Sequence, residues 1–168
     1  MLTTNQKGAI AETAITAEAT RIGIEVYRPV ADGGRFDLIF AFPDASLARV
    51  QCKWATLNGD VVVIRPYTCR RTRDGMRYRT YTAEEIDAIA AYCLELKRCF
   101  YVPIAKIERR RGFQLRLGPA RNNQSKRVNW AATYELGAIA QLGERPAGSR
   151  KVGGSNPPSS TSNVRPLF

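Results

Sequence analysis

Residues 35–54 read RFDLIFAFPDASLARVQCKW, and this stretch decides the fold. Two apolar runs, 36–42 and 47–54, lie on either side of the turn-forming residues 43–46, a pattern that predicts an antiparallel hairpin. The second run alternates between two faces. Its apolar face consists of Ala48, Val50, Cys52 and Trp54, and its polar face of Arg49, Gln51 and Lys53. Such alternation is ordinary in a half-buried strand, so by itself it indicates a strand and no chemistry.

Asp37 lies in the first of these runs, beside apolar residues, and a carboxylate in such a place needs a partner. Directly opposed residues of a hairpin point to the same face. Asp37 therefore meets Gln51 or Lys53 only if the turn has an odd number of residues or a bulge shifts the register. We predict such a turn near residues 43–45. A carboxylate, an amide oxygen and an ammonium group would then meet at the sheet edge, a set that suits Mg²⁺ beside a phosphodiester.

Helical patterns lie outside the hairpin. Residues 5–22 contain no proline and end before Gly23, so we expect a helix there. Its inward face would carry Ile10, Ala14, Ala17 and Ile22. Thr82 and Glu85 have the form of a capping box, which predicts a second helix after them. Its core side would carry Ile86, Ile89, Ala90 and Cys93. A last helix is expected over residues 128–136, with Trp130 as its anchor.

Further apolar runs predict strands at 24–30, 61–64, 99–104 and 113–117. Strands and helices that alternate along 168 residues predict an α/β fold with one domain, over residues 1–136. From Gly137 the composition changes to Gly, Pro, Ser and Asn, so residues 137–168 are expected to be a disordered tail. Segments 140–146 and 153–158 look like in-frame translations of transfer RNA D-arm and T-arm sequence. We therefore hypothesise that the reading frame runs through a tRNA gene.

The chain carries 26 Lys and Arg against 15 Asp and Glu, a formal charge of +11, which favours a polyanionic partner and above all nucleic acid. Arginines interleaved with tyrosines between residues 65 and 81 predict an exposed basic loop or hairpin, and a second basic run covers 106–111. The candidate DNA-binding residues are Arg70, Arg71, Arg73, Arg77, Arg79, Arg109, Arg110 and Arg111. The alternative interpretation of both segments is a solvated charged surface.

Several classes of site are disfavoured by composition. No histidine is present, which excludes imidazole as base or metal ligand. The four cysteines contain no C-x-x-C pair, so structural zinc and a disulfide framework are not expected, and Cys52 and Cys93 are expected to be buried thiols. The absence of a signal peptide or membrane-spanning run predicts a cytoplasmic protein that does not bind membranes.

The order of motifs resembles a known family. A helix with Gly8-x-x-x-Glu12 comes first, then Phe36-Asp37, then Gln51-Cys52-Lys53, as in the core of PD-(D/E)XK nucleases. The chain is similar to the branch encoded in bacterial group I introns, the homing endonucleases, over about residues 5–136. Further segments that carry this similarity are 81–87, Tyr92, 101–103, 115–117, 121–124 and 130–131.

The resemblance implies a restriction-endonuclease-like core, a central mixed sheet flanked by helices. It implies Asp37 as principal metal ligand, with the Cys52 carbonyl and the Gln51 side-chain oxygen beside it, and Mg²⁺ or Mn²⁺ as cofactor. Lys53 would orient or activate the attacking water, and Glu12 would bind through water or a second metal; for Glu12 the alternative is an ordinary surface glutamate. Gln51 departs from the acid usual in the superfamily, which lowers the charge available to a cation.

The resulting expectation is a metal-dependent endonuclease acting on double-stranded DNA, with a homing role, no small-molecule substrate, and a homo-oligomeric assembly, dimer or tetramer. Two alternatives stay open. A Holliday-junction resolvase shares this fold and these residues and differs in the preferred shape of its DNA. A non-catalytic basic module that binds DNA or RNA would share only the charge.

Overall fold

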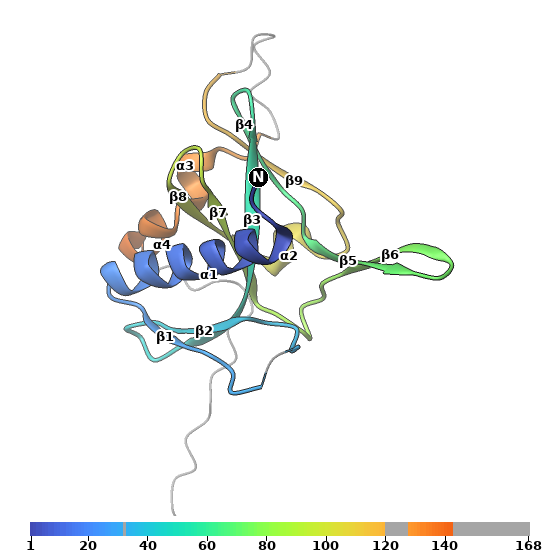
Figure 1. Ribbon diagram of the computed structural model, residues 1–168. Helices are drawn as coiled ribbons and strands as arrows, with labels where there is room; N and C mark the ends of the chain where they lie inside the picture. The colour runs from blue at the N-terminus through green and yellow to red at the C-terminus, as the bar shows by residue number, and fades with distance from the viewer. Residues whose placement is uncertain (32, 120–127, 143–168) are drawn as a thin grey trace, which may run out of the picture.

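A seven-stranded mixed sheet forms the centre of the molecule, and one long helix and several short helices lie against its faces (Figure 1). The computed structural model describes residues 1–31, 33–119 and 128–142. The helices are α1 (Thr4–Arg21), α2 (Ile104–Ile107), α3 (Ala131–Tyr134) and α4 (Leu136–Leu142). The strands are β1 (Glu25–Tyr27), β2 (Leu38–Ala41), β3 (Leu47–Asn58), β4 (Val61–Ile64), β5 (Tyr67–Thr72), β6 (Gly75–Thr80), β7 (Ala88–Cys93), β8 (Arg98–Pro103) and β9 (Phe113–Arg116). The α/β class and the mixed sheet expected from the sequence are confirmed.

The long strand β3 is the centre of this sheet. Its first part pairs antiparallel with β2, its middle pairs parallel with β7, and its end pairs antiparallel with β4. Strand β7 in turn pairs with β8, and β4 with β9. Because β3 pairs with β2, β7 and β4 in turn along its length, it fixes the places of these three strands in the sheet.

The turn between β2 and β3 has the predicted odd number of residues. The Phe42 amide donates to the Ser46 carbonyl at 2.9 Å, which closes a turn of three residues, 43–45. Ala45 adopts a left-handed φ of 64° inside it. The resulting register pairs Leu38 with Val50 and Ile39 with Arg49. When this register is extended by one residue pair, Asp37 lies opposite Gln51.

The prediction of a helix after Thr82 is wrong. This segment forms one turn and then strand β7. Glu85 and Ile86 donate to the Thr82 carbonyl, at 3.0 and 3.1 Å, and the chain then extends. Strand β7 lies parallel to β3 and is buried on both faces. A strand of this kind is apolar at nearly every position, so the spacing of its residues fits a helix equally well.

The sheet divides the core into two layers. One layer packs α1 and Leu136 of α4 against one side of the sheet, and it includes Phe40, Val50 and Tyr101. The other packs α2 and α3 against the opposite side, and it includes Tyr81, Phe100 and Leu115. Alternate residues of β7 contribute to opposite layers, as strand geometry requires.

The inward face of α1 differs from the predicted one. Ala11, Ile15 and Ala19 are buried, whereas Ile10 and Ala14 are only half-buried and Ala17 is exposed. The helix itself begins as expected. Thr3 and Gln6 form a capping box, and Gly23, with φ of 86°, follows its end.

The C-terminal helix is also corrected. In place of one helix over 128–136, α3 is separated from α4 by Glu135, and α4 continues to Leu142. The expected boundary at residue 137 therefore falls inside a helix, and Ile139 packs against the α1 layer. Residues 143–168, which include most of the predicted tail and of its tRNA-like segments, lie outside the described residues.

The basic segment between residues 65 and 81 was expected to be an exposed loop or hairpin, and the cysteines to be free thiols. Strands β5 and β6 form a separate two-stranded sheet that projects from the body, so the basic segment is a hairpin (Figure 1). All four cysteines are free thiols, and Cys52, Cys93 and Cys99 are buried. No helix in the described part of the chain is long and apolar enough to cross a membrane.

The buried face of α1 observed in the structure leads to a prediction about stability. Ile15→Ala removes a side chain that is 0% exposed and is expected to lower the free energy of unfolding by about 2–5 kcal/mol. The matched variant Ile10→Ala removes the same atoms from a half-buried position and is expected to cost less than half as much. Urea denaturation measures both, and equal losses would contradict the observed face.

Candidate active site and nucleic-acid interface

The side chains of Asp37 and Gln51 meet on one face of the β2–β3 hairpin. The Gln51 Nε2 donates to Asp37 Oδ2, and the Cys52 backbone N–H donates to the same oxygen at 2.8 Å. Gln51 is 8% exposed because it lies in the middle of β3. The juxtaposition predicted from the turn length is therefore present.

Two opposing effects act on the Asp37 carboxylate. Burial raises its pKa, and this effect outweighs the Cys52 hydrogen bond and the charges of Lys53 and Arg28, which lower it. The hydrogen bonds from Gln51 and from Cys52 both end on Asp37 Oδ2. Within the described residues, Oδ1 is thus left available to a cation.

Lys53 lies two positions further along β3, on the same face as Gln51. Burial lowers the pKa of its ammonium group, the Asp37 carboxylate raises it, and the Arg35 guanidinium lowers it again. Lys53 Nζ lies 5.1 Å from the centroid of the Tyr81 ring, a cation–π contact. No ion pair of Lys53 occurs among the residues that the structure describes.

Glu12 reaches the same site from α1. It lines a cavity of about 120 Å³ together with Asp37, Phe36, Arg28 and the loop that follows Arg28. Arg28 Nη1 lies 3.6 Å from Glu12 Oε2. The helix and the hairpin thus bring two carboxylates to one cavity beside one guanidinium, and Glu12 is no isolated surface residue.

The donors at this site are hard oxygens. They are the carboxylates of Asp37 and Glu12, the Gln51 amide oxygen and the Cys52 carbonyl, a set that fits Mg²⁺ or Mn²⁺. The Cys52 thiol does not belong to it, because burial raises its pKa far above neutrality. Across the described ranges no cluster of three or more His, Cys, Asp or Glu suits a metal, so any ion here depends on the amide and the carbonyl as well.

Sequence reasoning missed three residues that border this site. Arg35 and Tyr81 contact each other, with the Arg35 Cζ 4.2 Å from the ring centroid, and Arg28 faces Glu12. Arg35 could have been considered, since it is a cation only two residues before Asp37 in the sequence. Tyr81 could not, because it reaches the site only through the path of the chain after the projecting hairpin.

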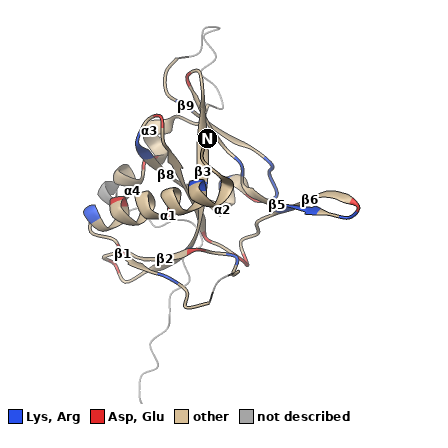
Figure 2. Cartoon of the chain, in the orientation of Figure 1, with Lys and Arg blue, Asp and Glu red and all other residues tan. Residues whose placement is uncertain are grey.

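The projecting hairpin, hereafter the arm (Tyr67–Thr80), has two different faces. Register pairs Arg70 with Arg77 and Thr68 with Arg79, which places these three arginines on one face, the arginine face. Arg79 also pairs with Glu85, which in turn binds Arg35 beside the active site. The arginine face is thus the one connected to Lys53 and Asp37. Figure 2 shows the concentration of basic residues on the arm.

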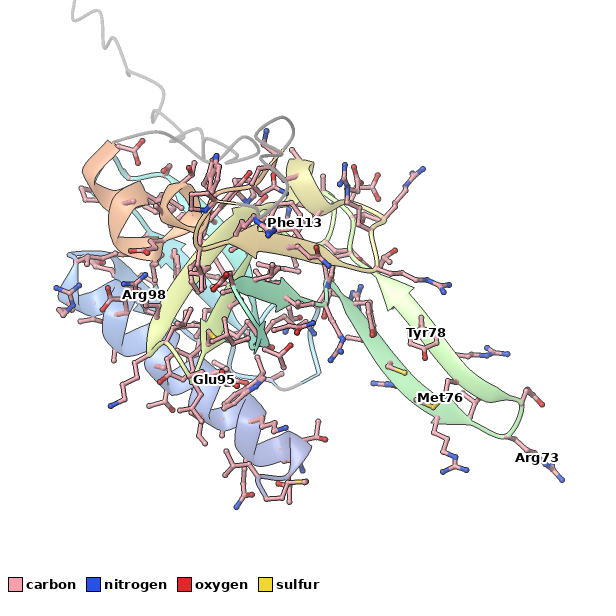
Figure 3. The ribbon with its side chains drawn as sticks, turned by 90° about the horizontal axis from the view of Figure 1, so that it is seen from above. Arg73, Met76, Tyr78, Glu95, Arg98 and Phe113 are labelled. Carbon is pink, nitrogen blue, oxygen red and sulfur yellow. The ribbon has the colours of Figure 1, made fainter. Side chains whose placement is uncertain are left out.

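The opposite face of the arm, the tyrosine face, carries Tyr67, Cys69, Arg71, Met76 and Tyr78. Tyr67 and Tyr78 pack edge to face, and Arg111 Cζ lies 5.2 Å from the Tyr78 ring. Arg111 therefore adjoins this face. Figure 3 shows Met76 and Tyr78 along the arm and Arg73 at its tip. The eight predicted DNA-binding arginines are exposed, and three of them, Arg70, Arg77 and Arg79, share the arginine face.

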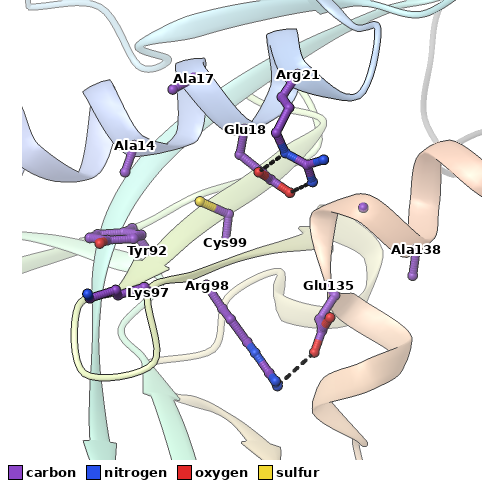
Figure 4. A pocket seen from close by; sticks show the side chains of 11 residues that line it. Ala14, Ala17, Glu18, Arg21, Tyr92, Lys97, Arg98, Cys99, Glu135 and Ala138 are labelled. Carbon is purple, nitrogen blue, oxygen red and sulfur yellow. Dashed lines mark hydrogen bonds and ion pairs between the residues drawn. The ribbon is translucent and has the colours of Figure 1, made fainter.

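A larger pocket of about 680 Å³ lies between α1, the β7–β8 turn and α4 (Figure 4). Its two carboxylates are already paired, Glu18 with Arg21 at 2.7 Å and Glu135 with Arg98 at 3.1 Å. It shares no lining residue with the cavity at Asp37. Hence its size does not make it the better candidate for a metal.

The sheet thus places Asp37, directly before β2, against Gln51 of β3, with Lys53 further along the same strand, on a strongly basic chain. Residues 2–137 match the family model described as PD-(D/E)XK endonuclease, and the chain belongs to this family. The family expected from the sequence is confirmed.

Among solved structures, a bacterial homing endonuclease, I-Ssp6803I, has the same fold. It superposes with a TM-score of 0.65 at 23% sequence identity, over 84% of this chain and 96% of that one. At this identity the likeness concerns the fold. No curated protein matches the sequence.

The burial of Asp37 makes a prediction about stability. Its folded pKa lies above its ordinary value, so the folded state holds the proton more tightly, and stability falls as the pH rises through the interval between these two pKa values. Asp37→Asn, measured without divalent cations, is expected to raise the melting temperature at pH 7 by a few degrees. At a pH below the ordinary pKa the gain should vanish. A lower melting temperature at pH 7 would show that the Cys52 hydrogen bond and the charges of Lys53 and Arg28 outweigh the burial of Asp37.

Proposed function

We propose that this protein is a metal-dependent endonuclease that hydrolyses phosphodiester bonds of double-stranded DNA at the Asp37 site. The contact of Asp37 with Gln51 and Cys52, beside Lys53 on the same strand, is the observation that supports this proposal most directly. Membership of the endonuclease family supports the reaction class. The charge of +11 supports a nucleic-acid substrate.

Asp37, Gln51, the Cys52 carbonyl and Glu12 would hold Mg²⁺ or Mn²⁺. When bound, such an ion polarises the phosphate oxygens and stabilises the charge that develops on them. The Gln51 amide Nε2 donates to Asp37, and a half turn about its last torsion would offer Oε1 in place of Nε2.

Lys53 has two tasks in this proposal. Burial lowers its pKa and so makes the neutral amine more accessible, and that amine can accept a proton from the water that attacks phosphorus. In its charged form the same group offsets negative charge on the phosphorane. The bond from phosphorus to the leaving oxygen then breaks, and the leaving oxygen takes up a proton from solvent.

The arginine face of the arm would contact the DNA whose phosphodiester lies at Asp37. Arg70 and Arg77 lie side by side across the two strands, and a two-stranded ribbon of this kind can enter a major groove. Arg73, at the exposed tip, and Arg109 to Arg111, at the base of the tyrosine face, would add phosphate contacts.

A homing role, with cleavage at a long specific site, is supported by the fold shared with I-Ssp6803I. A single site cuts one strand, so cleavage of both strands calls for a homo-oligomer, a dimer or a tetramer with its active sites related by symmetry. Sedimentation of the full chain would establish the assembly.

The central test uses plasmid DNA that carries randomised inserts, with Mg²⁺ or Mn²⁺ and with EDTA. Metal-dependent breaks are expected, and Asp37→Ala and Lys53→Ala are each expected to slow them by about a hundredfold or more. Binding without cleavage would favour the non-catalytic alternative. Faster cleavage of four-way junctions than of linear duplex would favour a resolvase.

The two faces of the arm allow a matched test of DNA contact. Arg70→Gln with Arg77→Gln removes two charges from the arginine face, and Arg71→Gln with Arg111→Gln removes two from the tyrosine face. The first pair is expected to reduce the slope of log K against log salt by about 2, and the second by less. Fluorescence anisotropy with a labelled duplex, without divalent cations, measures both. Equal slopes for the two double variants would mean that DNA binding depends on the total charge of the arm and not on which face carries it.

A further inference from the structure

We propose that Tyr81 and Arg35 are positioning residues that hold the Lys53 ammonium group beside Asp37. This inference rests on the proposed function, in which Lys53 takes part in cleavage. Its basis is that one buried aromatic ring contacts both cations: Lys53 Nζ lies 5.1 Å, and Arg35 Cζ 4.2 Å, from the centroid of the Tyr81 ring.

Tyr81 is a fixed platform for this purpose. It is 1% exposed and packs in the core layer that includes Ile86 and Leu115, directly after the arm returns to the body. Its hydroxyl is buried and has no hydrogen-bond partner within the described part of the chain. The contacts that Tyr81 makes with the two cations therefore come from its ring and not from its hydroxyl.

Arg35 is held in place from the other side. Its Nη2 donates at 2.9 Å both to the Thr80 carbonyl and to Glu85 Oε2. Burial opposes ionisation of Glu85, but the bond from Arg35 and the charges of Arg35 and Arg79 outweigh it and lower the pKa of that carboxyl. Glu85 is thus a charged anchor, and Arg35 is fixed against the ring of Tyr81.

The position of the ammonium group matters because the Lys53 side chain is long and flexible and lies close to the Asp37 carboxylate. Free of restraint, Lys53 could fold onto Asp37 and occupy the oxygen that a divalent cation needs. The ring gives the ammonium group a favourable contact that needs no carboxylate, and the neighbouring Arg35 charge keeps it from moving further along the ring. Lys53 stays near Asp37 without neutralising it.

The same contacts connect the arm to the active site. Thr80, the last residue of β6, binds Arg35 through its carbonyl, and Arg79 of the arginine face shares Glu85 with Arg35. The arm and the platform for Lys53 therefore have a common anchor. This explains why a tyrosine of the core lies at the junction between the arm and the sheet.

Tyr101 provides a matched control. It is also a core tyrosine, 1% exposed, with a buried hydroxyl that has no hydrogen-bond partner among the described residues, but it stacks on Phe40 in the other core layer. Tyr81→Leu and Tyr101→Leu remove the same ring and are both expected to lower the melting temperature. Tyr81→Leu alone is expected to slow single-turnover cleavage, by at least tenfold, with the DNA dissociation constant within twofold of the parent.

Tyr81→Phe, which keeps the ring, is expected to restore the rate lost in Tyr81→Leu. Should Tyr81→Leu fail to fold, Arg35→Gln decides, since it keeps a donor for Glu85 but removes the charge; an unchanged rate would overturn the proposal. Equal rates for the two leucine variants, well below their melting temperatures, would also overturn it. Normal cleavage by Lys53→Ala would contradict the catalytic role of Lys53 in the proposed function. An inactive Lys53→Ala together with a fully active Tyr81→Leu would leave that role intact and contradict only the positioning role of Tyr81.

Discussion

The pairing register of β2 with β3 is the constraint on which the site depends. Three turn residues place Asp37 opposite Gln51, and a slip of one position would rotate the Asp37 side chain to the layer occupied by α1. In that layer it would meet Phe40 and Val50, where a carboxylate has no partner. The same few hydrogen bonds therefore set which face of β3 is apolar and which side chains meet on its polar face. The register that is stable is also the one that the proposed cleavage needs.

Stability and chemistry nevertheless oppose each other within the site. Burial raises the pKa of Asp37 and lowers that of Lys53, so it disfavours the charged form of both groups. Both also stand on or beside the central strand, where apolar side chains of similar size would pack without this cost. The surrounding cations and hydrogen bonds compensate in part. Buried charged groups of this kind are a cost to the fold that the proposed catalytic roles of Asp37 and Lys53 would account for.

The hairpin, its odd turn and the polar face of β3 could be predicted because alternation and turn length are local properties of the sequence. Strand β7 could not, since burial on both faces removes the alternation that distinguishes a strand. The face of α1 was misjudged because alanines at positions 9, 11, 14, 17 and 19 offer several stripes of similar polarity. Tyr81 and Glu85 approach the site only through tertiary contacts, which no spacing along the chain records.

The charge balance of the site follows from Gln51. Two carboxylates, Asp37 and Glu12, stand among three cations, Arg28, Arg35 and Lys53, and a third carboxylate, Glu85, is bound to Arg35. With an amide in place of the usual acid, these side chains leave no excess negative charge for a divalent ion. A DNA phosphate would supply that charge at the proposed site, and its own attraction to the basic surface does not require the ion. In the proposed reaction the substrate therefore completes the cation site, and cleavage is confined to the time during which DNA is bound.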